Sequence, residues 1–260
     1  MLHYAISTAK LHRNGLNRDV GEADSYPTES TIMKLYYHPV STTSRPVLLL
    51  AADEGIALDH EVVDLFTGAH LQPAFASINP SQQVPVLEDG EFRLSESSAI
   101  LKYLAEKTGS AAYPKDLQKR ARINEVMDWF NTGLYRDLGY GLVYPQVLPN
   151  YKREDAALQK ANLAWAREKA CRWLDILDKD IIGANDYVCG KNISIADYLG
   201  IGMLSAGEVA HLDYAQWKNL SRWIATMKAR PTWDQVNEGF YTYFVAPYKD
   251  AAFEGLRGQP

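Results

Sequence analysis

The sequence has few cysteines and no long hydrophobic run. Only two of its 260 residues are cysteines, Cys171 and Cys189, and they form neither a disulfide framework nor a metal-ligand spacing. Two isolated thiols are typical of a reducing compartment, so we expect a cytoplasmic location. No apolar stretch approaches the ~20 residues that a membrane-spanning helix needs.

The chain also lacks an excess of positive charge. It has 27 Lys and Arg against 32 Asp and Glu, for a formal net charge of -5. This balance gives no electrostatic reason to expect nucleic acid or an anionic membrane as a partner. The 47% of hydrophobic residues is ordinary for a soluble globular protein, and the length allows one large domain or two modest ones.

Residues 1–31 differ from the rest because they are polar and lack hydrophobic periodicity. They contain no secretory hydrophobic region, so we predict a flexible N-terminal extension. Up to residue 109, strand and helix patterns then alternate. The predicted strands are 34–38, 58–65, 84–88 and 92–95, and the predicted helices are 41–55 and 96–108. The 66–79 connection has room for one helical turn.

The connections in this part predict the strand directions. A helix joins the first two strands, so they should be parallel, and Asp89-Gly90 predicts a hairpin between the last two. After residue 110 the strand patterns stop. The predicted helices there are 118–144, 153–182, 194–210, 214–229 and 232–243. The fold class is therefore an α/β domain over 32–109 followed by an all-α domain over 118–246, with a 247–260 tail.

The richest motif is residues 78–100, INPSQQVPVLEDGEFRLSESSAI. Pro85 cannot donate to a strand ladder, and Val84-Pro85 is a candidate cis bond that would turn the Val84 main chain outward. Glu96-Ser97 opens a helix, whose first N–H groups suit a carboxylate. The motif thus predicts a site that holds a small peptide by its backbone and by its charged end.

These parts together resemble a glutathione transferase, over residues 33–245. The loop LYYHPVSTTSRP at 35–46 resembles the serine-type active-site loop of theta-like enzymes. The segment VDLFTGAHLQPAF at 63–75 resembles the theta-class segment in which a histidine reaches the glycine end of glutathione. Ser194 to Asp197 resembles the capping box of the family's sixth helix. One departure is Gln82, which stands where the family often has glycine.

The resemblance implies a thioredoxin-like, glutathione-binding N-terminal domain and a helical domain with an electrophile pocket. Glutathione is then the co-substrate, and no metal is expected. A free thiol has a pKa of about 8.5, so the enzyme must lower that pKa to hold a thiolate. Ser41 is expected to donate a hydrogen bond to the sulfur, aided by the helix N-terminus. Thr42 and Ser44 are alternatives, although Ser44 fits a helix cap better.

The same resemblance assigns the rest of the glutathione site. Glu96 should pair with the γ-glutamyl ammonium, and Ser97 should bind the neighbouring carboxylate. Val84, before Pro85, should exchange main-chain hydrogen bonds with the cysteinyl unit. His70 and Gln83 are candidates for the glycyl carboxylate.

The electrophile pocket is expected between the domains. Its candidate residues are Tyr37, His38, Trp129, Tyr135, Arg136 and Tyr140. Arg136 lies about one position from the place where theta relatives carry an arginine. An aromatic C-terminal segment could cover the pocket, and it contains Phe240, Tyr241, Tyr243, Phe244 and Tyr248. For each of these aromatic residues, packing in the core or at a dimer surface is the alternative.

The predicted function is glutathione transfer to small hydrophobic electrophiles in detoxification, by conjugation, halide displacement or peroxide reduction. Thiol–disulfide exchange would need a cysteine near position 41 or 42, and the sequence has none there. A catalytically silent module for binding or assembly is the alternative. The family also implies a homodimer, in which a partner residue could complete the glutathione site.

Overall fold

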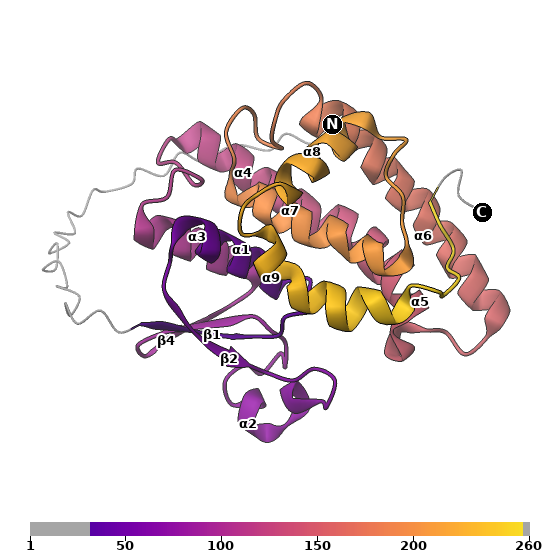
Figure 1. Cartoon of the computed structure of the whole chain (residues 1–260), viewed down its shortest axis with the longest axis horizontal. Coiled ribbons are helices and arrows are strands. Elements are labelled where there is room, and N and C mark those ends of the chain that lie inside the picture. The colour runs from indigo at the N-terminus through magenta and orange to yellow at the C-terminus, as the bar shows by residue number, and fades with distance from the viewer. Residues whose placement is uncertain (1–31, 257–260) are drawn as a thin grey trace, which may run out of the picture. The chain divides into compact units, whose positions relative to one another are not determined.

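A computed structural model describes residues 32–256. The prediction for residues 1–31 and the end of the predicted tail lie outside this range. The first half contains one four-stranded sheet in the order β2-β1-β3-β4 (Figure 1). Its strands are β1 Met33–Tyr37, β2 Leu58–Val62, β3 Val86–Asp89 and β4 Phe92–Ser95. β1 runs parallel to β2, whereas β3 is antiparallel to β1 and β4, which confirms the predicted directions.

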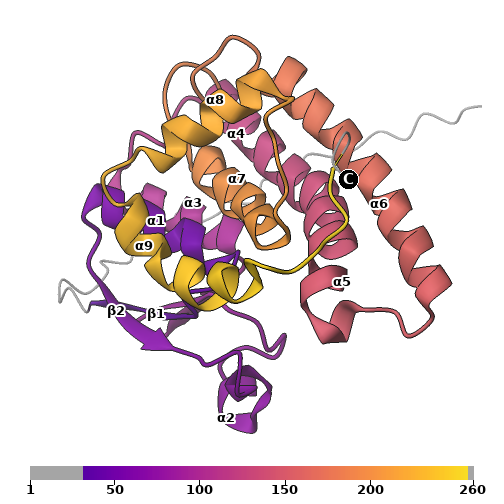
Figure 2. The same ribbon diagram turned by 45° about the vertical axis from the view of Figure 1, so that its right-hand side comes forward.

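Two helices pack on one face of the sheet and separate it from the helical half (Figures 1 and 2). They are α1, Ser44–Glu54, and α3, Ser97–Thr108. Each ends where the sequence predicts, because Gly55 and Gly109 take the left-handed conformation at φ 64° and 68°. The apolar face of α1 is buried over Val47–Ala51, so this helix belongs to the cores of both halves.

The connection from β2 to β3 contains a 3₁₀ turn, Ala69–Leu71, and the short helix α2, Pro73–Ala76. The predicted helical turn is therefore present. A small separate core of Val63, Phe75, Val84 and Val86 supports it. The hairpin prediction was off by one residue. Asp89 pairs with Phe92, so the two-residue loop is Gly90-Glu91, with Gly90 at φ 61°.

The second half is helical, as predicted. Its helices are α4 Leu117–Trp129, α5 Tyr144–Val147, α6 Ala156–Ile176, α7 Ile195–Ser205, α8 Lys218–Lys228 and α9 Trp233–Phe240. Two π-helical segments, Phe130–Leu134 and Arg136–Val143, lie between α4 and α5. The predicted helix at 214–229 starts too early, because residues 214–217 form a turn closed by the Trp217 N–H on the Tyr214 carbonyl. None of the helices within 32–256 has both the length and the hydropathy to cross a bilayer.

Helix α7 lies at the centre of the helical half, with all of its residues buried. The predicted capping box at its start is confirmed. The Asp197 carboxylate accepts the Ser194 N–H at 2.8 Å, and it also accepts the Trp223 Nε1–H at 2.8 Å and the Val188 N–H at 2.9 Å. Burial raises the pKa of this carboxyl, and these donors act in the opposite direction.

Candidate functional site

The serine loop, residues 39–44, joins the end of β1 to the first turn of α1. The half-buried Ser41 Oγ accepts the Ser44 N–H at 3.2 Å and lies 3.2 Å from Thr43 Oγ1. The Thr43 hydroxyl donates to the Val84 carbonyl at 3.0 Å. Because Thr43 has a single hydroxyl hydrogen, Ser41 must be the donor between the two hydroxyls. The hydroxyl hydrogen of Ser41 can therefore turn to a different acceptor if one is bound.

Ser44 does not act as the helix cap that the sequence suggested. Its N–H is the group that Ser41 accepts, and its own Oγ is buried without a hydrogen-bond partner among the described residues. The other alternative, Thr42, is 5% exposed, and its Oγ1 accepts the hydroxyl of Tyr144 at 2.9 Å. Thr42 is thus tied to the helical half, while Ser41 remains at the open side of the loop.

Arg45 anchors the same loop to the helical half. This 2% exposed side chain donates from Nη1 to Ser205 Oγ at 3.0 Å and to Asn237 Oδ1 at 2.8 Å, and from Nη2 to the Gly202 carbonyl at 3.3 Å. Its guanidinium lies 3.7 Å from the ring centre of Phe240. Burial lowers the pKa of Arg45 to about 10, because desolvation disfavours the charged form of the guanidinium.

The other end of α1 has a second anchor. The side chain of Asp53 accepts the Tyr198 hydroxyl at 2.9 Å and also accepts hydrogen bonds from Arg230 and Thr232. All three donors belong to the helical half. Gly202 of α7 completes the contact, because a Cβ there would lie 2.5 Å from the Pro46 ring and 3.0 Å from the Thr42 carbonyl. The position and direction of α1 are thus fixed at both ends.

The segment before β3 brings Val84 against the serine loop. The Val84-Pro85 bond is cis, as predicted, and Val84 is 7% exposed. Gln82, at the position where the family often has glycine, takes the left-handed conformation at φ 54°. This conformation costs roughly 1–2 kcal/mol for a residue with a side chain. Gln83 is exposed, and its carbonyl accepts the Asn79 amide at 2.8 Å.

Glu96 precedes α3 in a strained conformation. Its backbone has φ 69° and ψ 113°, and its side chain is exposed. Such a conformation costs on the order of 1–3 kcal/mol and is concentrated at functional sites. Ser97 follows as the first residue of α3 and is 6% exposed. An exposed carboxylate and a helix N-terminus therefore adjoin each other, an arrangement that suits an ammonium group beside a carboxylate.

Burial lowers the pKa of His38; the Asp64 carboxylate acts in the opposite direction, and His70 lowers the pKa further. His38 is 5% exposed, accepts the Val40 N–H at Nδ1 and packs edge-on against Phe66 at 5.1 Å. It is therefore a packing residue under the serine loop rather than an open pocket wall. His70 is half-buried, and its Nδ1 is enclosed without a hydrogen-bond partner in the described part of the chain.

The predicted electrophile residues do not all come together. Trp129 packs against Trp173 of α6 at 5.4 Å. Arg136 donates to Asp137 at 3.0 Å, and its side chain is 61% exposed. Tyr37 packs against His60 of β2 at 5.2 Å.

The residue that reaches the loop is Tyr135, one position before Arg136. Its hydroxyl lies 2.5 Å from that of Tyr144, which bonds to Thr42. One position is about 100° of rotation around a helix, so a one-residue difference in register decides which side chain faces the site.

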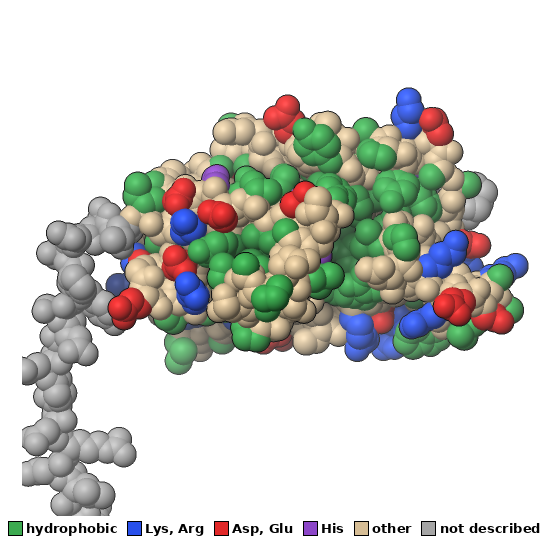
Figure 3. Space-filling view, turned by 90° about the horizontal axis from the view of Figure 1, so that it is seen from below, with side chains coloured by type: hydrophobic (Ala, Val, Ile, Leu, Met, Phe, Trp, Pro, Cys, Tyr) green, Lys and Arg blue, Asp and Glu red, His purple; other side chains and the backbone are tan. Residues whose placement is uncertain are grey.

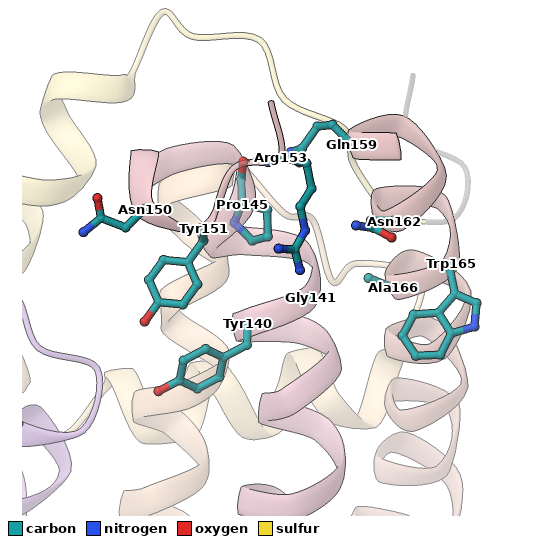
Figure 4. Close-up of a pocket in the computed structure, with 10 residues that line it drawn as sticks. All are labelled: Tyr140, Gly141, Pro145, Asn150, Tyr151, Arg153, Gln159, Asn162, Trp165 and Ala166. Carbon is teal, nitrogen blue, oxygen red and sulfur yellow. Dashed lines mark hydrogen bonds between the residues drawn. The ribbon is translucent and has the colours of Figure 1, made fainter. Parts of the chain in front are cut away.

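Tyr140 is 41% exposed and packs against Tyr135 at 5.1 Å. Burial raises the pKa of Tyr140 to about 12, and Tyr144, Tyr151 and Glu96 add to this rise. Tyr140 and Tyr151 pack at 5.7 Å beside a cavity of about 250 Å³. Figure 4 shows the two rings at one end of this cavity, Trp165 at the other and the Arg153 side chain between them.

The C-terminal aromatic segment lies against the serine loop. Phe240 covers Arg45, and a Cβ on Gly239 would lie 2.7 Å from Pro39. Tyr243 is mostly exposed, whereas the Tyr248 hydroxyl donates to the Val147 carbonyl at 2.9 Å. Hydrophobic side chains gather across the middle of the face seen in Figure 3, with most charged ones toward its ends.

Residues 32–106 match the family description "Glutathione S-transferase, N-terminal domain", and residues 144–231 match "Glutathione S-transferase, C-terminal domain". A delta-class glutathione transferase from Nilaparvata lugens is similar in structure, with a TM-score of 0.70, 32% identity and coverage of 84% of this chain and 98% of its own. An unclassified glutathione S-transferase from Bombyx mori is similar with a TM-score of 0.72 and 30% identity, over 84% of this chain and 98% of its own. A ligand-free variant of human glutathione S-transferase T1-1 is similar with a TM-score of 0.70 and 27% identity, over 84% of this chain and 96% of its own. The chain belongs to the glutathione S-transferase family.

Proposed function

We propose that this chain is a serine-type, theta-like glutathione transferase that uses Ser41 to hold the glutathione thiol as a thiolate. The observation that carries the proposal is the geometry of the Ser41 hydroxyl. It lies at the N-terminus of α1, one hydroxyl away from the Val84 carbonyl, and its hydrogen is held only by another hydroxyl. A thiolate is a stronger acceptor than the Thr43 hydroxyl and would take this hydrogen.

The helix and the bound peptide then act together. The first N–H groups of α1 add partial positive charge at the position where the sulfur becomes negative. Ser41 is a donor to the substrate's nucleophile in this proposal, and the sulfur itself attacks the electrophile. The displaced group leaves with the bonding electron pair, as halide does from an alkyl halide, while sulfur forms the new bond to carbon.

The remaining glutathione contacts follow the peptide from end to end. Glu96 pairs with the γ-glutamyl ammonium, and Ser97 binds the adjacent carboxylate at the start of α3. Val84, next to Pro85, exchanges main-chain hydrogen bonds with the cysteinyl unit, in the manner of an added strand. His70 and Gln83 bind the glycyl carboxylate. The Nδ1 of His70 supports its part, because it has no hydrogen-bond partner among the described residues and a buried polar atom needs one.

We place the electrophile beside Tyr135 and Tyr140, under the aromatic C-terminal segment, and leave Trp129 and Arg136 out of the pocket. Small hydrophobic electrophiles fit that environment, by conjugation, halide displacement or peroxide reduction. A homodimer in the cytoplasm completes the proposal.

The test compares Ser41→Ala with Ser44→Ala. A hydrogen bond to a charged group contributes about 1.5–3 kcal/mol, so loss of the Ser41 donor should raise the pKa of bound glutathione by about 1–2 units. Turnover of a chromogenic halide substrate should fall about tenfold or more at pH 6.5 and recover as the pH rises, because a raised pKa removes thiolate only below it. Ser44→Ala should change neither quantity, since its Oγ has no partner within 32–256.

Binding of glutathione with no turnover of any electrophile would instead favour the silent module. If Ser41→Ala kept both the thiol pKa and the pH profile of the wild type, the role given to Ser41 would be wrong. Retention on immobilised glutathione, measured for both variants, separates lost binding from lost thiolate.

A further inference from the structure

A chain of three buried hydroxyls crosses from the helical half to the serine loop. The Tyr144 hydroxyl donates to Thr42 Oγ1 at 2.9 Å, and the Tyr135 hydroxyl lies 2.5 Å from that of Tyr144. The three side chains are 5–7% exposed. Thr42 and Tyr144 are 102 positions apart in the sequence, so the fold alone brings them together.

The bonded threonine is the residue between the two hydroxyls of the glutathione site. Ser41 precedes it, and Thr43, which bonds to the Val84 carbonyl, follows it. Two backbone bonds already hold the start of this turn, from the Ser41 N–H to the His38 carbonyl at 3.0 Å and from the Arg45 N–H to the Ser41 carbonyl at 3.1 Å. Neither fixes the side chain of Thr42. The Tyr144 hydroxyl bonds to that side chain, and so it ties Thr42 to the helical half beside the anchors at Arg45 and Gly202.

Tyr144 can serve only as a hydrogen-bond donor or acceptor at neutral pH. Burial raises the pKa values of both Tyr144 and Tyr135, and Arg45 opposes the shift only in part for Tyr144. The raised pKa values disfavour the phenolate form of both side chains. The network must act through geometry, by holding protonated hydroxyls in place.

A core tyrosine with no such role shows a different pattern. Tyr214 is buried to a similar degree, at 8% exposed, but its hydroxyl donates to the carbonyl of Leu204 within the helical half at 2.9 Å. Both tyrosines satisfy a buried hydroxyl, and only Tyr144 does so on the loop that carries the proposed catalytic serine. Tyr214 is therefore a matched control.

We infer that Tyr144 is a positioning residue for thiolate formation: its hydrogen bond to Thr42 sets the serine loop so that the Ser41 hydroxyl and the first N–H groups of α1 point at the glutathione sulfur. The inference rests on the proposed function. It also links the two substrates, because the rings of Tyr140 and Tyr151 pack against Tyr144 at 5.2 and 5.5 Å. An electrophile that moves these rings acts on the same loop.

The test measures the pKa of enzyme-bound glutathione, by ultraviolet difference absorbance of the thiolate, in Tyr144→Phe and Tyr214→Phe. A neutral hydrogen bond is worth about 0.5–1.5 kcal/mol, so Tyr144→Phe should raise the thiol pKa by about 0.4–1 unit. The kcat/KM at pH 6.5 should then fall about two- to tenfold and return to the wild-type value at high pH. Tyr214→Phe should lower Tm by about as much as Tyr144→Phe does, and it should leave the thiol pKa unchanged.

Two variants of Thr42 check that the hydrogen bond is the cause. Thr42→Val removes the hydroxyl that accepts the bond and should reproduce the effect of Tyr144→Phe. Thr42→Ser keeps that hydroxyl and should retain the wild-type pH profile. The Tyr144→Phe/Thr42→Val double variant should be no worse than either single one, because both remove the same bond. These comparisons remain informative if one variant folds poorly.

A Tyr144→Phe enzyme with a lowered Tm but the wild-type thiol pKa would overturn the inference and leave Tyr144 a plain core residue. Additive effects of the two single variants would overturn it as well. Failure of the proposed function would look different: the wild-type enzyme would bind glutathione without lowering its thiol pKa below that of free glutathione.

Discussion

Replacement of Arg45 by Met tests whether contacts or desolvation decide the energy of a buried charge. The side chain is 2% exposed, and among the described residues its hydrogen bonds end on neutral oxygens. Burial lowers its pKa from 12.5 to about 10, which corresponds to about 3 kcal/mol against the charged form. That cost is present throughout the neutral range, because the folded protein would release this proton only above pH 10.

The contacts act in the opposite direction. Each of the three hydrogen bonds from the charged guanidinium contributes about 1.5 kcal/mol or more, and a desolvated contact with the Phe240 ring contributes about 2 kcal/mol. Arg45→Met loses these contacts and leaves Asn237 Oδ1 buried without its donor. The lowered pKa already reflects these contacts, so the net change comes from the buried acceptors left without a donor, which cost about 1–3 kcal/mol each, and we expect the free energy of unfolding to fall by about 3 kcal/mol.

Urea unfolding followed by tryptophan fluorescence measures this change, and Tm should fall by about 6–12 °C. Arg172→Met is the control, because Arg172 is exposed on α6 and its loss should change stability by less than about 0.5 kcal/mol. An Arg45→Met protein as stable as the wild type would refute the reasoning. It would mean that the charge costs more than its contacts return, as replacement of some buried ion pairs has shown.

Three further predictions concern the site and the anchors of α1. Gly202→Ala should lower stability by about 1–3 kcal/mol and reduce glutathione turnover, because the new Cβ would displace the serine loop; Gly55→Ala, at φ 64° with open space around its Cβ, should cost about 1–2 kcal/mol through backbone strain alone and keep the activity. Glu96→Gln should raise the KM for glutathione about tenfold to a hundredfold without changing the thiol pKa, and an unchanged KM would remove Glu96 from the site. Asp53→Asn should lower the free energy of unfolding by about 2–4 kcal/mol, since Arg230 loses its charged partner, and a change below 1 kcal/mol would contradict the role of this anchor.

The sequence was informative wherever the determinants are local. Gly55 and Gly109 end their helices as predicted, the hairpin forms within one residue of Asp89-Gly90, and Ser194 and Asp197 cap α7. Each of these features depends on a few neighbouring residues, so a short pattern is enough to predict it. The position of Ser41 between β1 and α1 follows from the same kind of signal.

The contacts that complete the site have no local signal. Thr43 meets Val84 across 41 positions, Tyr144 meets Thr42 across 102, and Arg45 meets Asn237 across 192. Polar residues in a loop or on a helix usually face water, and nothing in the neighbouring sequence marks these as buried.

The electrophile pocket has the weakest sequence signal. The resemblance offered Arg136 with a register about one position off, and the π-helical segments between α4 and α5 change the rotation per residue, so spacing in the sequence does not decide which side chain faces the loop.

The two anchors of α1 oppose the polarity of the helix that carries them. Arg45 places a cation in the first turn and Asp53 an anion in the last, and each arrangement is unfavourable for a helix taken alone. Both charges become acceptable only when α7, α9 and the Arg230–Thr232 segment surround them. A chimera that joins this first half to the second half of a distant relative should therefore misfold unless both sets of partners are transplanted with it, which limits how such genes can recombine during evolution.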